Sequence, residues 1–326
     1  MKKILGLMLL LVVIGNSIIV TAEQNVEYDC SNWAVDNVTM ANIIGIVDDK
    51  TYSYSDPISR KDFCELIYNL ILQTDYFENW YNEQTKGSTQ EIAPFAKRPF
   101  DDTDSEAVYI LYNHDIVQGK TLTEFAPDDT LTREEAATII VRMINTVQPL
   151  PTKEKYYAYD DIDQMSEWSL QSIQTISNLG FMKGVGSNRF APKDNLTTEQ
   201  AITTVLRVYN VFKNNSVLKF VDKDGNIILT QNDIVSCNTA YNEIIPGTGE
   251  EWYVEIILTS DAREKFKKAT KYISKYAENY ISVIVDNSVV SEPRVMEEID
   301  SESVLVMGEF TEESVKAFKD VICLEK

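Results

Sequence analysis

Three ordered copies of one sequence motif occupy the first two thirds of this 326-residue chain. Each copy runs from an aromatic residue and an aspartate, through an apolar segment, to a glycine-containing loop, a turn and a closing motif led by Ser or Thr. The copies extend over 27–75, 98–148 and 156–212. A unit of this size cannot bury its apolar face alone, so repeated units are expected to pack against one another.

The residue spacing predicts two helices in each copy. The first carries apolar residues three and four positions apart, as in Ile173, Ile176 and Leu179, which places them on one helical face. The second begins at a capping box, in which Thr132 would accept from the amide of Glu135 while the Glu135 side chain reaches back. The sequence therefore predicts a mostly α amino-terminal region, a helical bundle of three repeats.

Two stretches separate the copies. Residues 76–97 are rich in Asn, Gln, Thr and Ser, and are interpreted as an elongated connector between the first and second copies. A Pro-Leu-Pro sequence at 149–151 separates the second copy from the third, because proline ends helices.

The motifs are most complete in the second copy. It reads Phe100-Asp101-Asp102, then Ile116-Val117-Gln118-Gly119, then Phe125-Ala126-Pro127, and closes with Thr132-Arg133-Glu134-Glu135. In the first copy, Tyr54-Ser55-Asp56-Pro57 is matched to the turn. These motifs resemble S-layer homology domains. The resemblance implies a pseudo-threefold arrangement of helical prongs, attached non-covalently to pyruvylated secondary cell-wall polysaccharide in the grooves between them.

Arg60 and Arg133 are the main candidates for ligand contact. Each falls at the first position of a predicted helix, where the macrodipole disfavours a cation. Helix amino termini bind anions, and a guanidinium can hold a carboxylate through two hydrogen bonds. The alternative is that each arginine pairs with an aspartate such as Asp101 or Asp102. Thr198 takes this position in the third copy, so one groove is expected to be weakened or empty.

Five further side chains are candidates for sugar contact. Trp33 and Trp168 could stack on sugar faces, or could pack in the core between prongs. The aspartates that open the copies could orient an arginine or a sugar hydroxyl, or could cap helices; they are Asp29, Asp101 and Asp160.

The net charge of -21 limits the partners of this chain. A protein this acidic should not bind nucleic acid, and it should be repelled by anionic polymers unless cations are placed locally. The expected partner is therefore the wall polysaccharide, held by particular basic side chains, with a protein or peptide as a further partner.

The first 22 residues have the pattern of a signal peptide. Lys2 and Lys3 precede an apolar run from Ile4 to Ile14, and Ala22 is a small residue at the expected cleavage point. The alternative is an uncleaved anchor, although the apolar run is short for a membrane span. No later segment is long and apolar enough to span a bilayer, so a secreted, wall-attached protein is expected.

The four cysteines fall into two pairs along the chain, Cys30 with Cys64 and Cys237 with Cys323. Export permits disulfides, and pairing within each half is the simplest connectivity. The alternative is four buried free thiols. No Cys/His cluster has metal-ligand spacing, and no cofactor is expected.

A different pattern, of short strands and helices, extends over 218–326. Tyr253 to Leu258 alternates as a strand does, Ser260 is expected to cap a helix, and Thr311 starts a closing helix. The sequence predicts a small α+β domain with helices on one face of a sheet. The strand 254–258, the segment 284–293 and the segment 307–311 resemble the extracytoplasmic head of the protein-export protein SecD, which implies contact with protein or peptide.

The sequence offers no catalytic constellation. His114, the one histidine, has no Ser or Cys partner in a recognisable motif and is expected at a solvated helix end. The prediction is a surface protein that is not an enzyme, anchored by its repeats and displaying its carboxyl-terminal domain. The alternative is a secreted accessory or binding protein whose repeats are only structural.

Overall fold

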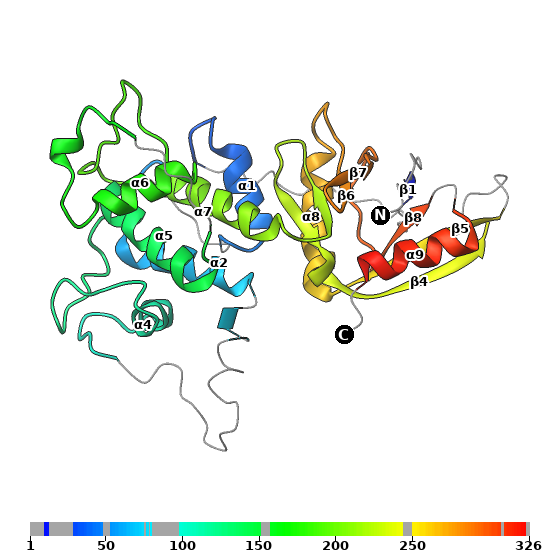
Figure 1. Cartoon of the computed structure of the whole chain (residues 1–326), viewed down its shortest axis with the longest axis horizontal. Helices are drawn as coiled ribbons and strands as arrows, with labels where there is room; N and C mark the ends of the chain where they lie inside the picture. Colours follow the sequence, from blue (N-terminus) through cyan, green and yellow to red (C-terminus); the bar gives the residue numbers. More distant parts are fainter. Residues whose placement is uncertain are drawn as a thin grey trace, which may run out of the picture. The chain divides into compact units, whose positions relative to one another are not determined.

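The computed structural model describes residues 10–12, 29–47, 53–74, 76–77, 79, 98–150, 157–243, 250–307 and 310–323. The chain divides into two compact units (Figure 1). The repeat unit comprises Glu27–Phe212, and the sheet unit comprises Lys213–Lys326 together with Met1–Val26.

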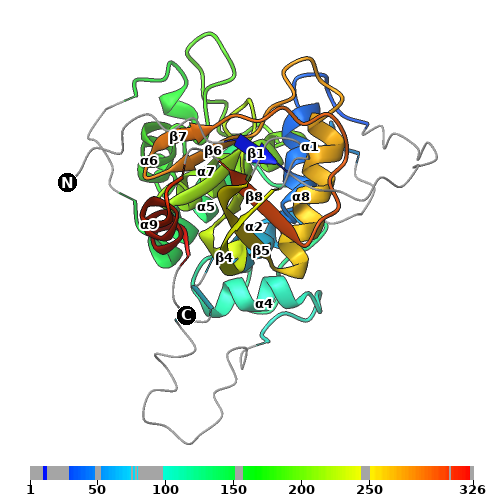
Figure 2. The same ribbon diagram turned by 90° about the vertical axis from the view of Figure 1, so that its right-hand side faces the viewer.

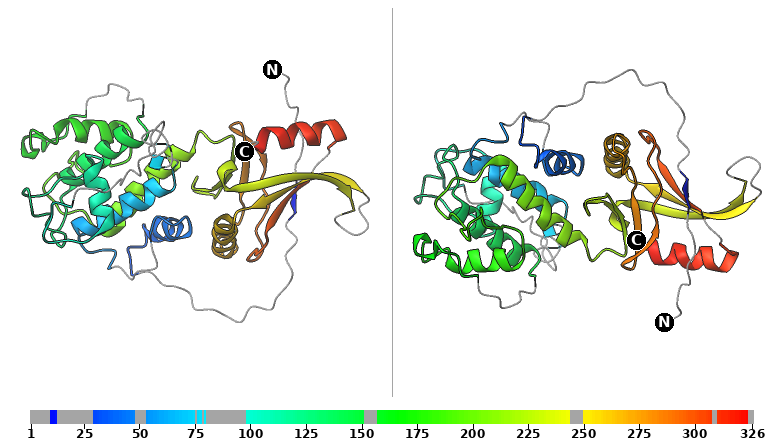
Figure 3. Two further views of the ribbon diagram at one scale, coloured as in Figure 1. Left: turned by 90° about the horizontal axis from the view of Figure 1, so that it is seen from below. Right: turned by 90° about the horizontal axis from the view of Figure 1, so that it is seen from above.

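Each repeat contributes a short helix and a longer one among the described residues (Figure 3). The short helix of one repeat packs on the long helix of the repeat before it: α4 on α2, and α6 on α5. A 3-10 helix, η1 (Ile162–Gln164), precedes α6. The pairs are α1 (Val35–Ile43) with α2 (Arg60–Leu72), α4 (Glu106–Asn113) with α5 (Arg133–Val147), and α6 (Leu170–Asn178) with α7 (Thr198–Lys213).

The long helices begin where the closing motifs predict. The Thr132 side chain accepts from the amide of Glu135, and the Glu135 carboxylate accepts from the Thr132 amide, so the predicted capping box is confirmed. Ser59 caps α2 by accepting from the amide of Asp62. Thr197 accepts from the amide of Gln200 at 3.4 Å. These side chains satisfy amides that a helix cannot satisfy by itself.

A closed ring of backbone hydrogen bonds joins the three repeats. The Ile58 amide donates to the Leu196 carbonyl at 2.9 Å, and the Leu196 amide donates to the Leu131 carbonyl at 2.8 Å. The Leu131 amide completes the ring by donating to the Ile58 carbonyl at 3.1 Å. Each of these residues immediately precedes the cap of its long helix and is fully or almost fully buried. Each repeat therefore supplies one donor and one acceptor to its neighbours.

The prediction of a mostly α bundle of three repeats is wrong. Fewer than half of the described residues of the repeat unit are α-helical. The repeats meet through loops and isolated antiparallel bridges, which join Pro57 to Thr197, Ser59 to Thr130 and Thr132 to Asn195. Apolar periodicity reveals helices within a copy, but it carries no information about backbone pairing between the loops of different copies.

The sheet unit also differs from the single sheet that the sequence predicts. Its described strands form two antiparallel four-stranded sheets, in the orders β1-β8-β5-β4 and β3-β2-β6-β7 (Figure 2). The predicted alternation in β5 is confirmed, since every second residue from Val254 to Leu258 is buried. The strands are β1 (Leu10–Val12), β2 (Leu218–Val221), β3 (Ile227–Thr230), β4 (Ile234–Asn242), β5 (Glu251–Leu258), β6 (Ser282–Val285), β7 (Ser288–Ser291) and β8 (Ser303–Met307).

Two helices cover strands of these sheets. Helix α8 (Ser260–Ile273) buries Ala262, Phe266, Ala269 and Ile273 and packs on β3 and β5. Its cap is Thr259, one residue before the expected Ser260, because the Thr259 hydroxyl accepts from the Ala262 amide. Helix α9 (Glu312–Ile322) is capped by the predicted Thr311 and packs on β4 and β5.

The cysteines form one of the two expected pairs. Cys237 in β4 and Cys323 at the end of α9 are joined by a disulfide with a Cα–Cα distance of 6.1 Å. Cys30 and Cys64 are free thiols, so the expected pair between them is not formed. Cys64 is buried inside α2, whereas the segment of Cys30 is tied to α7 through hydrogen bonds from Ser31 to Glu199. Burial raises the pKa of the Cys64 thiol to about 12.

None of the described helices combines the length and apolar character needed to traverse a lipid bilayer. The described residues also hold no group of His, Cys, Asp and Glu side chains suited to a metal ion. The predicted signal peptide, 1–22, lies outside the described residues apart from β1, and the predicted connector, 76–97, lies outside them apart from residues 76, 77 and 79.

We expect the disulfide to stabilise the sheet unit selectively. Replacing both Cys237 and Cys323 with serine should lower the free energy of unfolding of that unit by about 2–4 kcal/mol, because the bond closes a long loop in the unfolded chain. Differential scanning calorimetry resolves the two units if they unfold separately. The matched control, Cys30→Ser, should leave the sheet-unit transition unchanged; an equal shift from both variants would contradict the assignment.

Candidate functional site

Arg60 reaches out of the first repeat into the loops of the second. Its Nε donates to the Phe125 carbonyl at 3.0 Å, and Nη2 donates to the Gln118 carbonyl at 3.0 Å. The guanidinium lies 4.6 Å from the centroid of the Phe125 ring, and Nη1 is 4.0 Å from Glu135. The residue is only 6% exposed. Arg60 therefore fastens the glycine loop and the Phe-Ala-Pro turn of the next repeat.

Arg133 makes the same contacts one repeat further on. Its Nε donates to the Phe190 carbonyl at 2.9 Å, and Nη2 donates to the Lys183 carbonyl at 2.9 Å. The guanidinium stands 5.0 Å from the centroid of the Phe190 ring. Its Nη1 has the longest contact, 3.4 Å to Gln200. Burial lowers the pKa of Arg133, although nearby carboxylates oppose this shift.

The first backbone amides of α2 and α5, the helices that begin at these arginines, already have hydrogen-bond acceptors. The amides of Arg60 and Lys61 donate to carbonyls of the second repeat, and those of Arg133 and Glu134 donate to carbonyls of the third. The third amide of each helix donates to the Ser or Thr cap. The expected anion site on free helix amides is therefore absent from α2 and α5, because the neighbouring repeat supplies the acceptors.

Thr198 closes the same arrangement without a guanidinium. Its amide and its hydroxyl both donate to the Asp56 carbonyl, at 2.9 and 3.3 Å, and the Glu199 amide donates to the Tyr54 carbonyl. Tyr54 thus does for α7 what Pro127 does for α2. The matching of Tyr54 to the phenylalanine of the turn is therefore wrong by two positions, because Tyr54 corresponds to Pro127 and not to Phe125.

Glu134 forms a buried polar cluster between the second and third repeats. Its carboxylate accepts from the Ser166 amide, the Ser166 hydroxyl and the Ser169 hydroxyl, each at 3.0 Å, and pairs with Lys193. Burial acts to raise the pKa of Glu134, but the hydrogen bonds from Lys193 and the serines outweigh it and hold the pKa below its ordinary 4.5. Half of the Lys193 side chain is exposed.

Glu199 repeats part of this cluster between the third and first repeats. Its carboxylate accepts from the Ser31 amide at 2.9 Å and from the Ser31 hydroxyl at 2.8 Å. In both clusters a tryptophan follows two residues after the serine: Trp33 is 54% exposed and Trp168 is 55% exposed. The alternative that these indoles pack in the core is therefore wrong. The serine–glutamate hydrogen bonds hold the segments that contain the two tryptophans at the surface.

The aspartates that accept hydrogen bonds from the turns of the second and third repeats are not the candidate residues Asp101 and Asp160. Asp101 and Asp160 are exposed, as is Asp29. The next residue along, Asp102, accepts from the amides of Phe125 and Ala126, at 2.9 and 2.7 Å, and these bonds lower its pKa. Asp161, buried in the third repeat, accepts from the amides of Phe190 and Ala191. The sequence signal for this role is the pair of adjacent aspartates at 101–102 and at 160–161. The second aspartate of each pair accepts hydrogen bonds from backbone amides of the turn in the same repeat.

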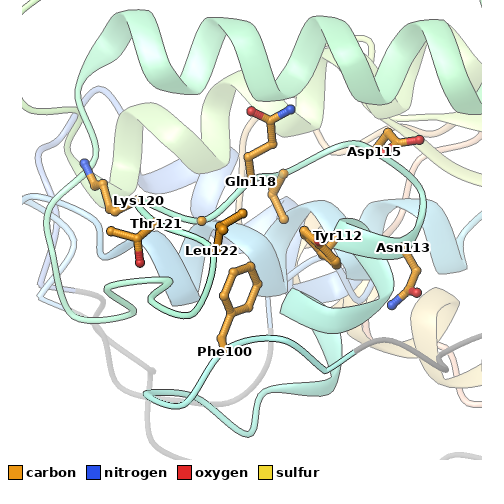
Figure 4. Close-up of a pocket in the computed structure, with 10 residues that line it drawn as sticks. Phe100, Tyr112, Asn113, Asp115, Gln118, Lys120, Thr121 and Leu122 are labelled. Atoms are coloured by element: carbon orange, nitrogen blue, oxygen red, sulfur yellow. The ribbon is translucent and has the colours of Figure 1, made fainter.

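A hollow of about 510 Å³ lies within the second repeat (Figure 4). It is lined by Phe100, Tyr112 and most residues of the loop 113–122, in which Leu122 is 90% exposed. The loop requires glycine at position 119, where a Cβ would lie 2.5 Å from the Phe100 ring. Lys120 on its rim pairs with Glu135 at 3.1 Å. Because Arg60 holds the Gln118 carbonyl, the hollow adjoins the junction between the first two repeats.

His114 is buried, so the prediction that it lies at a solvated helix end is wrong. It is 8% exposed, and its Nδ1 lies 2.9 Å from the Tyr76 hydroxyl. The ring of Phe77 lies 5.5 Å away, so the histidine fixes the first residues that follow the first repeat. Burial lowers the pKa of His114. The reason is long-range packing, which the sequence around His114 does not encode.

Acid should weaken the repeat unit through Glu134. A carboxylate whose folded pKa is depressed stabilises the fold above its unfolded pKa, and this stabilisation is lost as the pH falls through the folded pKa. Urea denaturation from pH 7 to pH 3 should show Glu134→Gln less stable at pH 7, with the difference from the wild type narrowing below about pH 4.5. A difference that is constant with pH would contradict this role.

Removing the Arg133 guanidinium should destabilise the repeat unit. Arg133→Met keeps much of the side-chain volume but leaves the Phe190 and Lys183 carbonyls without their donor, which should cost about 2–4 kcal/mol. The control is Arg189→Met, whose half-exposed side chain is 3.8 Å from Asp161 and should contribute less than about 1 kcal/mol. Equal losses in chemical denaturation would contradict the special role of Arg133.

Comparison with known proteins matches both parts of the chain. The sequence model of the S-layer homology domain matches residues 99–137 and 158–202. The model described as "SecDF, P1 head subdomain" matches residues 208–322. A solved structure titled "Structure and function of a membrane component SecDF that enhances protein export" is 15% identical, with a TM-score of 0.25, over 32% of this chain and 44% of that chain. The assignment of this region rests on the sequence match.

Curated relatives match over limited segments. An endoglucanase of Bacillus sp. (strain KSM-635) is 25% identical over 51% of this chain and 17% of that protein. A cell surface protein of Thermoanaerobacter kivui is 30% identical over 37% of this chain and 16% of that protein. The chain spans less than a fifth of the length of either relative, and the two domains that its sequence matches are non-catalytic. The chain is a cell-surface protein that carries S-layer homology domains followed by a SecDF P1 head subdomain.

Proposed function

We propose that the repeat unit anchors the protein non-covalently to an anionic, pyruvylated secondary cell-wall polysaccharide. The sheet unit is then displayed outside the membrane for contact with a protein or peptide. The protein acts as a binding protein and not as an enzyme. The polysaccharide would lie along the junctions between repeats, where loops of one repeat meet the long helix of another.

The observation that carries this proposal is the exposure of Trp33 and Trp168 beside the buried serine–glutamate clusters. An indole that is more than half exposed offers an apolar face on which a sugar ring can stack. The clusters hold each tryptophan segment rigidly, which reduces the entropy lost on binding. Two such surfaces in one chain suit a polymer with repeating sugars.

Charge recognition would come from cations at the same junctions. The chain as a whole repels polyanions, with a net charge of -21, so the local cations decide the outcome. Lys193 is half exposed and donates to the hydroxyl of Ser166, two residues before Trp168 in the chain. Lys120 lies at the rim of the hollow. We also propose that Nη1 of Arg60 and Nη1 of Arg133 donate to the ligand carboxylate. In each guanidinium this nitrogen has the longest distance to its present partner, 4.0 Å to Glu135 and 3.4 Å to Gln200.

The exposed aspartates that open the repeats complete the proposed surface. Asp29, Asp101 and Asp160 can accept hydrogen bonds from sugar hydroxyls. Asp160 already accepts from Asn188 at 2.7 Å, so it is held in place for such a contact. These contacts would add specificity for hydroxyl geometry to the stacking and the ionic contact.

A second function is favoured by one observation. Both arginines are buried, and each gives two donors to backbone carbonyls. If these contacts are their whole role, the repeats are a scaffold, and the protein is a secreted accessory protein whose sheet unit finds the partner. The two functions differ in whether exposed side chains of the repeat unit are needed for wall binding.

Co-sedimentation with purified cell walls tests the anchoring. The full chain should pellet with native walls and stay in solution with walls stripped of secondary polymer. Trp33→Ala with Trp168→Ala should weaken binding by about tenfold or more, since each stacked aromatic contributes about 1 kcal/mol. Met296→Ala is the control, because Met296 is 75% exposed in the sheet unit.

The outcome separates the two functions. Binding that needs the polymer and the tryptophans supports anchoring through the repeat unit. Binding that survives both tryptophan substitutions, or that is equal on stripped walls, contradicts the proposed surface. No binding to native walls would leave the scaffold function.

A further inference from the structure

We infer that the outer edge of β8 in the sheet unit is a docking site for an extended, apolar segment of another polypeptide. The edge is covered in the full chain by β1, which pairs antiparallel with β8 (Figure 2). The inference gives the proposed peptide contact of the sheet unit a place and a mode. It rests on that part of the proposed function and is independent of wall anchoring.

Strand β8 has a different strand on each side, and only one of the two lies outside the predicted signal peptide. On its inner side it pairs with β5 along its whole length, from Ser303 opposite Ile257 to Met307 opposite Tyr253. On its outer side it pairs with only three residues, in the register Leu10–Met307, Leu11–Val306 and Val12–Leu305. The inner pairing belongs to the 218–326 region, whereas the outer pairing comes from the predicted signal peptide.

Removal of residues 1–22 would uncover this edge. Cleavage after Ala22 takes away all of β1, so the outward amides and carbonyls of β8 would lose their partners. An unpaired edge strand is a template for another extended chain, which adds to the sheet through backbone hydrogen bonds. The leader of this chain shows that a short strand fits there in antiparallel orientation.

The composition of β8 selects an apolar occupant. Its residues from Val304 to Met307 are all buried, none of them more than 7% exposed. The segment whose backbone pairs with β8 here has the sequence Leu-Leu-Val. A strand added at this edge extends both faces of the sheet, so apolar side chains on it would continue the buried apolar faces of β8, whereas polar side chains would interrupt them.

The opposite edge of the same sheet is protected. Strand β4 has an irregularity in its pairing between Ile234 and Ser236, and most of its residues are at least partly exposed. It is also fixed to α9 by the disulfide at Cys237. Bulges and polar residues discourage strand addition, so β8, with no bulge against β5, is the edge that accepts a partner.

Hydrogen exchange on the chain 23–326 tests the inference. The probe is a synthetic peptide with Leu-Leu-Val flanked by lysines for solubility. The peptide should slow exchange of the amides in 303–307 and leave those of β4 unchanged. A peptide methylated on its backbone nitrogens keeps the side chains but loses donors, and it should bind about fivefold weaker for each hydrogen bond lost.

The chain 1–326, which retains its leader, is the matched protein control. It should show slow exchange in 303–307 without peptide and should bind the peptide more weakly than 23–326. Peptide binding without protection of 303–307, equal binding of the methylated peptide, or equal binding by both chains would overturn the inference. Protection that rises with protein concentration alone would assign the edge to a second copy and would overturn it too. Wall co-sedimentation is unaffected by any of these outcomes.

Discussion

The ring of three backbone hydrogen bonds among Ile58, Leu131 and Leu196 is the constraint on which the repeat unit depends. Each of these residues stands directly before a helix cap, so the ring fixes where the three long helices start and how they are turned. The first amides of each long helix then find their acceptors in the turn of the next repeat. A single repeat would leave these buried groups without partners, which costs more than most single contacts contribute.

The arginines extend the same logic from backbone to side chain. A guanidinium has five donors in a fixed plane, and Arg60 and Arg133 each use two of them to hold a glycine loop and a turn of the following repeat. The loops are thereby shaped by a neighbour and not by their own helices. The surface proposed for polysaccharide is consequently a property of the closed repeat unit. At the third junction Thr198 supplies a hydroxyl to the Asp56 carbonyl in place of a guanidinium.

The parts of the structure that could be predicted from the sequence depend on local periodicity. The capping box at Thr132, the alternation of β5 and the apolar face of α8 follow from residues a few positions apart. The helix content, the exposure of Trp168 and the buried state of His114 depend on contacts between distant residues, and there the sequence misled. The contacts of Glu134 could not be predicted, because this residue lies within a capping motif and its partner Lys193 is 59 residues away.

The most direct measurement is native-state hydrogen exchange of the amides of Ile58, Leu131 and Leu196. If the ring closes the repeat unit, all three amides should exchange only through unfolding of the whole unit, with one common free energy and one common dependence on denaturant. If one amide exchanges at a much lower free energy than the other two, its repeat opens independently. That result would contradict the account that three repeats are held together by one closed ring.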